Sequence, residues 1–238
     1  MRFYTNQHPF YCGIDLHART MYLCILSQDG EVMLHRNMKA SPDALLKAIA
    51  PYRDHMVIAV ACLFTWYGLA DLCAQAGLPF VLGHALYMQA LPGGKATNDK
   101  IDSQKIAMLL RGGLLPQASV YPAERRATRE LLRRRRHLTR QRAALLAHLQ
   151  NTTSQYKLPE IGQKLAYKGK RDGVAERFPA PAAQKSVEGD LALLDHYDRL
   201  LSEVALTIVR TAKQHNAQAL YRLQAVPGLG KILRLVLL

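Results

Sequence analysis

The chain has 238 residues, which is enough for one large domain or two smaller ones. Apolar residues make up 49% of it, so it has ample material for a packed core and is not disordered throughout. Its 32 lysines and arginines outnumber its 18 acidic residues, which gives a formal charge of +14. Such an excess favours a polyanionic partner, and nucleic acid is the commonest, although basic proteins without this function also exist.

The cysteines and the apolar stretches limit the compartment. The four cysteines show neither C-x-x-C spacing nor histidines at zinc-finger spacing. The first ten residues lack the apolar core of a signal peptide, and no stretch approaches the roughly 18 apolar residues that span a bilayer. We therefore expect a cytoplasmic protein with reduced cysteines and no membrane partner.

The chain begins with three strand patterns and a helix pattern. Strands are predicted at 10–17, 21–27 and 31–38, and their short connections predict an antiparallel meander. A helix is predicted over 41–52, because Ser41 supplies a capping hydroxyl and is followed by proline and an acid in the first turn.

Strand and helix patterns continue to alternate. The apolar run 56–60 predicts a central strand buried on both faces. A helix over 66–76, a short strand at 80–82 and a short helix from Ala85 are predicted next. This order is that of the ribonuclease H-like fold, although other mixed α/β domains share parts of it. We predict an α/β domain of this class over residues 1–120.

Beyond Pro122 the sequence becomes helical and basic. A long helix is predicted to about Asn151, with leucines every seven residues and arginines on either side. A second long helix is predicted over 187–213, and the two are expected to pack as an antiparallel pair or against another subunit. The segment 152–186 between them predicts a partly mobile basic insertion. Together they form a predicted basic, coiled-coil region over 121–215.

The last predicted element follows a glycine-rich turn at 226–231. The turn resembles that of a helix-hairpin-helix, whose backbone amides meet phosphate, and it lacks the spacing of an ATP-binding loop. The apolar run after it does not bury itself well alone. We therefore expect 216–238 to be the beginning of a C-terminal domain that is cut short.

Arginines on the first long helix are the main candidates for nucleic-acid contact. A charge run is usually a solvated face, but four consecutive arginines repel one another strongly unless anions lie nearby. Contacts to phosphate hold the register of a nucleic acid without reading its sequence. The predicted nucleic-acid-binding residues are Arg125, Arg126, Arg129, Arg133, Arg134, Arg135, Arg136, Arg140 and Lys231.

Three aspartates are predicted to hold metal ions. Asp15 interrupts an apolar strand, where a carboxylate is costly unless a charge meets it; the alternative is a strand-end residue exposed by a bulge. Asp99 and Asp102 share a helical face if a helix begins near Asp99, whereas Asp102 alternatively caps a helix over 103–111. In a ribonuclease H-like core the three carboxylates converge, and such clusters bind Mg²⁺ in pairs for displacement at phosphorus.

Three neighbouring residues leave two interpretations open. His17 is within reach of Asp15, where it orients a ligand or simply packs. Trp66 and Tyr67 are able to stack on bases, but aromatic residues after a central strand more often belong to the core.

Several motifs resemble the insertion-sequence-110 family of DEDD transposases. They are Gly13-Ile14-Asp15-Leu16-His17, Phe64-Thr65-Trp66-Tyr67, the stretch from Lys95 to Leu110, and Val226-Pro227-Gly228-Leu229-Gly230. The resemblance covers essentially the whole chain. It implies a RuvC-like N-terminal domain, a coiled-coil middle and a C-terminal transposase domain with a serine nucleophile. It also implies an RNA-guided recombinase of a prokaryotic mobile element, acting at the nucleoid, in which a structured bridge RNA pairs with donor and target DNA.

The resemblance also implies roles for individual residues. Asp15, Asp99 and Asp102 correspond to the first, third and fourth catalytic acids, which hold Mg²⁺, two ions in an intact site. The family has a glutamate at the end of the fourth strand, where this chain has Ala61. An engineered change, natural decay and a shift of register all explain the difference, and we favour a true replacement of glutamate. The family's serine falls downstream of Leu238.

Two classes of function follow. The first is a metal-dependent DNA transposase or recombinase, impaired at Ala61, that binds DNA and guide RNA as a homodimer or tetramer. The second is a non-catalytic RNA- and DNA-binding remnant of such an enzyme. A Holliday-junction resolvase-like nuclease is a weaker alternative, because the arginine-rich helix and the glycine turn fit transposases better.

Overall fold

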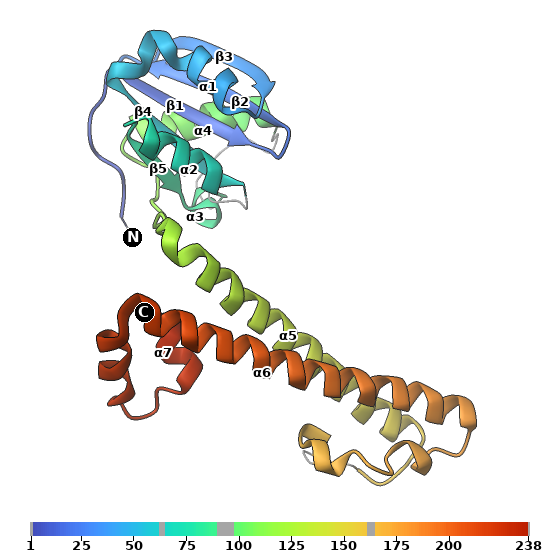
Figure 1. The fold of residues 1–238 in the computed structure, drawn as a ribbon. Coiled ribbons are helices and arrows are strands. Elements are labelled where there is room, and N and C mark those ends of the chain that lie inside the picture. The colour runs from blue at the N-terminus through green and yellow to red at the C-terminus, as the bar shows by residue number, and fades with distance from the viewer. Residues whose placement is uncertain (1, 62–64, 90–97, 161–164, 238) are drawn as a thin grey trace. The chain divides into compact units, whose positions relative to one another are not determined.

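The structure is a computed structural model that describes residues 2–61, 65–89, 98–160 and 165–237 (Figure 1). Of the side chains in these ranges, those of 89, 212–216 and 231 are not described. The chain divides into two compact units, Met1–Ala123 and Glu124–Leu238, and each is described by itself. None of the described helices offers a stretch long and apolar enough to cross a membrane.

The first unit is built on a mixed five-stranded sheet. Its strands are β1 (Phe10–Leu16), β2 (Thr20–Ser27), β3 (Val32–Lys39), β4 (Met56–Ala61) and β5 (Phe80–Gly83). Their order across the sheet is β3-β2-β1-β4-β5, with antiparallel pairing from β1 to β3 and parallel pairing of β1 with β4 and of β4 with β5. The predicted meander and element order are confirmed, and the sheet is consistent with an α/β nuclease-like domain.

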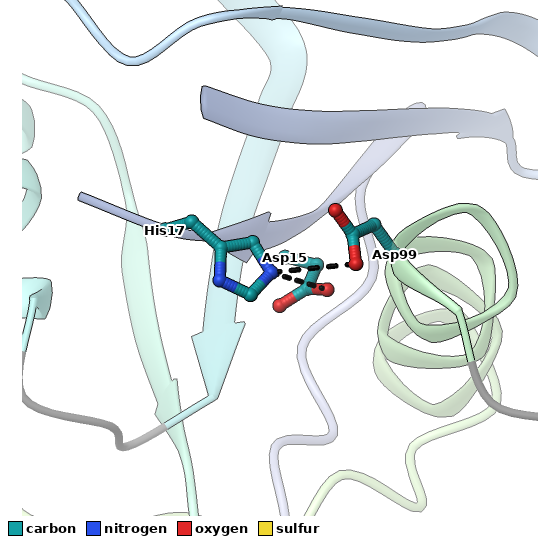
Figure 2. A group of neighbouring side chains, drawn as sticks. All are labelled: Asp15, His17 and Asp99. Carbon is teal, nitrogen blue, oxygen red and sulfur yellow. Dashed lines mark ion pairs between the residues drawn. The ribbon is translucent and has the colours of Figure 1, made fainter. Parts of the chain in front are cut away.

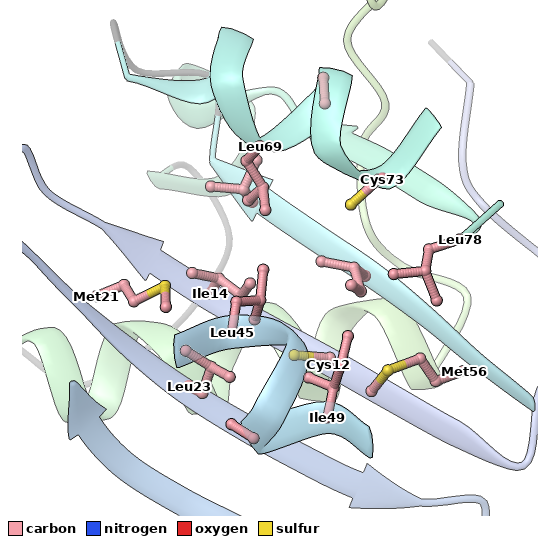
Figure 3. Close-up of a cluster of buried hydrophobic side chains, with 14 of the residues drawn as sticks. Cys12, Ile14, Met21, Leu23, Leu45, Ile49, Met56, Leu69, Cys73 and Leu78 are labelled. Carbon is pink, nitrogen blue, oxygen red and sulfur yellow. The ribbon is translucent and has the colours of Figure 1, made fainter. Parts of the chain in front are cut away.

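Helices cover both faces of this sheet. Their bounds are α1 (Pro42–Ile49), α2 (Trp66–Gln75), α3 (Ala85–Gln89) and α4 (Asp99–Arg111), with a 3-10 helix at Ala50–His55. Side chains of α1 and α2, such as Leu45 and Leu69, pack on Ile14 and Leu23 in one apolar cluster (Figure 3). A second cluster on the opposite face joins α4 to β1, β4 and β5.

The helix predicted over 41–52 is wrong at its end. The α-helix starts as predicted, with the Ser41 hydroxyl accepting a hydrogen bond from the Ala44 amide at 3.4 Å. It ends at Ile49, because Pro51 has no amide hydrogen to continue an α-helical pattern, and the chain tightens into the 3-10 turn.

Two long helices dominate the second unit. They are α5 (Ala123–Gln155) and α6 (Pro181–Gln224), and α7 (Lys231–Leu237) follows. Arg142 pairs with Asp198 at 2.6 Å, and His148 pairs with Asp190 at 2.7 Å, so α5 and α6 lie antiparallel within this unit. The antiparallel packing is the first of the two predicted arrangements. Helix α6 is longer than the predicted 187–213 at both ends.

The segment between the long helices is folded in its described residues, 156–160 and 165–180, which corrects the prediction of a partly mobile insertion for these residues. It contains 3-10 turns at Lys168–Lys170 and Ala175–Arg177. Its apolar side chains Leu165, Val174 and Phe178 are buried in one cluster with Leu149 of α5 and Leu194 of α6. The composition indicated a linker, but these spaced apolar residues give the segment its own share of a core.

The chain turns back after α6 through the predicted glycine-rich turn. Gly228 has a φ of 80°, in the left-handed region that glycine adopts without steric cost. Beyond it Leu235 of α7 is buried with Ile208 and Leu220 of α6. A separate C-terminal domain over 216–238 stays a prediction.

Candidate metal centre

Asp15 lies near the carboxyl end of β1, next to Tyr22 of β2 in a regular antiparallel register. Asp15 is only 8% exposed, and its neighbours along the strand are apolar, which is an unusual setting for a carboxylate. The alternative of a bulge-exposed residue is wrong, because the register of β1 with β2 runs without a shift through Leu16. The fold therefore holds a carboxylate in a largely buried position.

Helix α4 reaches Asp15 because its backbone packs directly on β1. A Cβ atom at Gly13 would lie 2.3 Å from the Ser103 carbonyl oxygen and 2.4 Å from the Ala107 amide nitrogen. Ser103 and Ala107, one helical turn apart, are both fully buried. Asp99 lies one turn before Ser103, so the same helical face carries it to the end of the strand where Asp15 lies.

The start of α4 decides the position of both acids on this helix. The Asn98 side chain caps the helix by accepting a hydrogen bond from the Ile101 amide at 2.9 Å. The alternative of Asp102 as the cap is therefore wrong, and both aspartates lie in the first turn, as the favoured prediction required.

His17 brings the two acids together. Its Nε2 atom lies 3.4 Å from Asp15 Oδ2 and 3.4 Å from Asp99 Oδ1, and Figure 2 shows the ring reaching both carboxylates. One ligand atom from each of the three residues lies within 4.8 Å of the other two. With 48% of its side chain exposed, His17 is not buried in the core, and its role toward a ligand stays a prediction.

The electrostatics of the centre favour a cation. Burial raises the pKa of the Asp15 carboxyl, and the Asp99 and Asp102 carboxylates raise it further, while His17 acts in the opposite direction. Asp102 thus lies near enough to interact with Asp15, although it is not a member of the group formed by Asp15, His17 and Asp99. A bound cation would relieve the repulsion among the three carboxylates.

Ala61 lies beside Asp15 on the same face of the sheet. Ile14 pairs with Val60 in the parallel register, so the next residues of the two strands, Asp15 and Ala61, are neighbours. Ala61 packs partly buried against the apolar cluster on the α4 side. A longer acidic side chain at this position would point toward the same face as Asp15.

The sequence interpretation missed His35, which helps to build this centre. His35 of β3 contacts the Lys100 carbonyl oxygen at 3.0 Å and the Ser103 hydroxyl at 3.4 Å, and its ring meets Tyr22 edge-on at 5.2 Å. It therefore holds the first turns of α4 over the sheet. The one available signal was Gly13, because a glycine inside a strand often marks a close backbone approach.

The predicted nucleic-acid-binding residues lie on α5, apart from Lys231. Arg133, Arg134, Arg136 and Arg140 are exposed, and Arg125, Arg126, Arg129 and Arg135 are half-buried. Arg133 contacts Glu130 at 3.1 Å. Lys231 begins α7, but its side chain is outside the described part.

The structure decides the prediction for Trp66, whereas two of the motif segments lie outside the described residues. Trp66 is only 2% exposed, and the Tyr67 ring meets it edge-on at 4.5 Å, so Trp66 is a core residue. The segments 62–64 and 90–97, which contain Phe64 and Lys95 of the family motifs, lie outside the described residues.

Comparison with known proteins agrees with this arrangement. No curated protein sequence matches the chain. A family model described as a transposase, of the DEDD type of insertion sequence 110, matches residues 12–157, which is more than half of the chain. The matched range contains the three aspartates and the arginines of α5. The chain therefore belongs to the DEDD transposase family of insertion sequence 110.

Proposed function

We propose that the chain is a metal-dependent DNA transposase or recombinase whose ribonuclease H-like, RuvC-like unit holds Mg²⁺ through Asp15, Asp99 and Asp102. The observation that carries this proposal is the convergence of Asp15 and Asp99 from separate elements, with one oxygen of each 3.4 Å from His17 Nε2. The family supports it, because DEDD transposases act on DNA and their acids imply a divalent metal.

The residues of the centre have separate tasks in this mechanism. Asp15 is fixed by the sheet and gives the site a rigid, largely buried oxygen ligand. Asp99 and Asp102 project from the first turn of α4, so the helix sets their distance from the strand. Mg²⁺ held by these residues would supply activation of the attacking oxygen and stabilisation of the leaving oxygen of a phosphodiester.

We infer that this chain is catalytically impaired because alanine replaces a glutamate at position 61. Ala61 neighbours Asp15 on the face toward α4, where a fourth acid would complete the set. A shift of register is a weaker explanation, since the regular β1–β4 pairing already puts residue 61 beside Asp15. Alanine fits the partly buried strand end, so the fold is expected to tolerate the replacement.

The second unit is proposed to hold nucleic acid. The exposed arginines of α5 are suited to phosphate contacts with DNA and with a structured guide RNA. The long helices are proposed to act as a coiled coil that also joins subunits into a dimer or tetramer. The family's serine nucleophile has no counterpart that we assign within this chain.

Strand cleavage in Mg²⁺ tests the proposal. The chain as it stands should show no cleavage above background. In a longer version that also carries the family's serine region, Ala61→Glu should raise cleavage by about 100-fold or more over the same version with Ala61, through a restored ligand. Ala61→Gln is the matched control, since glutamine has nearly the same size as glutamate but carries no charge. Efficient cleavage by the unchanged chain would contradict the account of Ala61.

A non-catalytic remnant is the second candidate, and Ala61 is the observation that favours it. It predicts salt-sensitive binding of DNA and structured RNA without cleavage in either the chain or Ala61→Glu. Failure to bind structured RNA in a salt titration would contradict the proposed guide-RNA binding, but it would not contradict the proposed DNA binding.

A further inference from the structure

We propose that His17 is itself a metal ligand, so that Asp15, His17 and Asp99 form a single-ion site that selects a transition-metal dication over Mg²⁺. This rests on the proposed function in one respect, namely that the acids of this centre bind a metal. It departs from the proposed function in naming a nitrogen ligand, one ion per chain with alanine at position 61, and a transition-metal dication in place of Mg²⁺.

The distances from His17 Nε2 to the two acids suit ligand atoms around one ion. Elsewhere in the chain His148 meets Asp190 at 2.7 Å, the normal length of a histidine–carboxylate hydrogen bond. His17 Nε2 instead lies 3.4 Å from one oxygen of each of the two acids. Ligands at about 2.1 Å from an ion in tetrahedral geometry are themselves about 3.4 Å apart.

The backbone holds His17 where a ligand is needed. It follows Asp15 by two residues, so both side chains lie on the face of the sheet that α4 covers, and the His17 amide donates to the Thr20 carbonyl oxygen at 2.9 Å. Nearly half of the His17 and Asp99 side chains is exposed, at 48% and 46%. An ion thus has access from solvent and keeps open positions for water or substrate.

The donor set determines the metal class. Mg²⁺ prefers oxygen ligands and near-octahedral geometry, whereas imidazole nitrogen favours first-row transition dications. Two carboxylates and one imidazole with an open position match the pattern of a three-ligand site for such ions. The two carboxylate charges neutralise one dication.

Among the residues that the structure describes, a second ion has fewer ligands than the first. Ala61, beside Asp15, offers no oxygen from its side chain, and Asp102 lies outside the three-residue group. One ion per chain is therefore expected with alanine at 61, and a second should bind once a glutamate is present there.

Metal titration of the purified chain tests this proposal. Mn²⁺ binding is followed by electron paramagnetic resonance, with Mg²⁺ as competitor. Co²⁺ binding is followed by its visible absorption, which reports the coordination number and geometry of the ion. The unchanged chain should bind one Mn²⁺ at least about tenfold more tightly than Mg²⁺. His17→Ala should weaken Mn²⁺ binding by about 10–100-fold while changing Mg²⁺ binding by less than about threefold.

Matched variants separate this proposal from the proposed function. His55→Ala, which removes an exposed imidazole outside the centre, should leave both affinities unchanged. His17→Asp should abolish the preference for Mn²⁺ while keeping a site. If Asp15→Asn and Asp99→Asn abolish binding but His17→Ala does not, the His17 proposal is overturned and the acid site stands. If the acid variants change nothing, the metal part of the proposed function is overturned as well.

Discussion

The metal centre depends on Gly13, which has no side chain. Gly13 lets α4 lie directly on β1, and that contact brings Asp99 to Asp15. Any Cβ at this position meets backbone atoms of Ser103 and Ala107, which cannot rotate away as a side chain can. A single atom at Gly13 therefore affects both the stability of the unit and the geometry of its acids.

Gly13→Ala is expected to destabilise the first unit by about 3 kcal/mol, because overpacking against backbone forces α4 to shift. Urea unfolding followed by the fluorescence of Trp66, the single tryptophan of the chain, measures this unit alone. Gly68→Ala is the control, since its Cβ would meet nothing within 4 Å and alanine favours the helix. Equal stability of the two variants would contradict the close approach.

Asp15→Asn is expected to stabilise the metal-free first unit by about 1 kcal/mol. The carboxylate is buried and repelled by Asp99 and Asp102, both of which raise its pKa, so a neutral amide removes an unfavourable charge. Trp66 fluorescence during urea unfolding in a chelator measures the change. A less stable Asp15→Asn variant would show that the charge is compensated without metal.

At the scale of elements, one buried arginine ties the inter-helix segment to α6. The Arg171 side chain is 4% exposed and pairs with Asp195 and, at 2.5 Å, with Asp198. Its Nε also donates to the Leu165 carbonyl oxygen at 3.1 Å. Arg142 of α5 meets the same Asp198, so α5, α6 and the segment share one network.

Arg171→Ala is expected to destabilise the second unit by about 2–3 kcal/mol, less than for a fully buried pair because both aspartates stay partly exposed. Far-UV circular dichroism follows this helical unit, and Trp66 fluorescence should keep its midpoint. Lys170→Ala, an exposed neighbour, is the control. A shift in the Trp66 transition would mean that the effect is not local.

The same network predicts acid sensitivity. Burial alone would raise the pKa of Asp198, but hydrogen bonds from Arg142 and Arg171 outweigh it and hold the pKa below the ordinary 3.8. The stabilisation by Asp198 is therefore fully present above pH 3.8 and is lost as the pH falls through the lower folded-state pKa. Thermal unfolding of the helices should show this loss, and Asp198→Asn should flatten it. An Asp198→Asn profile as steep as the original would assign the acid loss to other groups.

At the scale of the whole molecule, the charge of +14 should govern binding to nucleic acid. Replacing Arg134, Arg136 and Arg140 by glutamine should lower the slope of log K against log salt by about 2–3, nearly equally for unrelated sequences. Lys185→Gln, on α6 and exposed, should lower it by less than about one. Fluorescence anisotropy with labelled duplexes and RNA measures the slopes, and equal slopes would place the contacts elsewhere.

Much of the fold was predictable because its signals are local. The strands of the meander alternate or are continuously apolar, Ser41 caps α1, and leucines recur along α5, so their spacing alone fixes which face is buried. The largest error came where local and tertiary effects compete. The inter-helix segment has a linker's composition, yet Leu165 and Phe178 find partners on helices far away in the sequence.

The sequence by itself determined the family, the α/β order of the first unit, the helical second unit and the three aspartates worth testing. Residue type and spacing carry that information directly. Only the tertiary structure decided that Asp15 and Asp99 meet around His17, and that Ala61 lies beside Asp15. Ala61 and Asp99 are far from Asp15 in the chain. Their proximity to it depends on strand register and on the packing of α4 against Gly13, which no local pattern specifies.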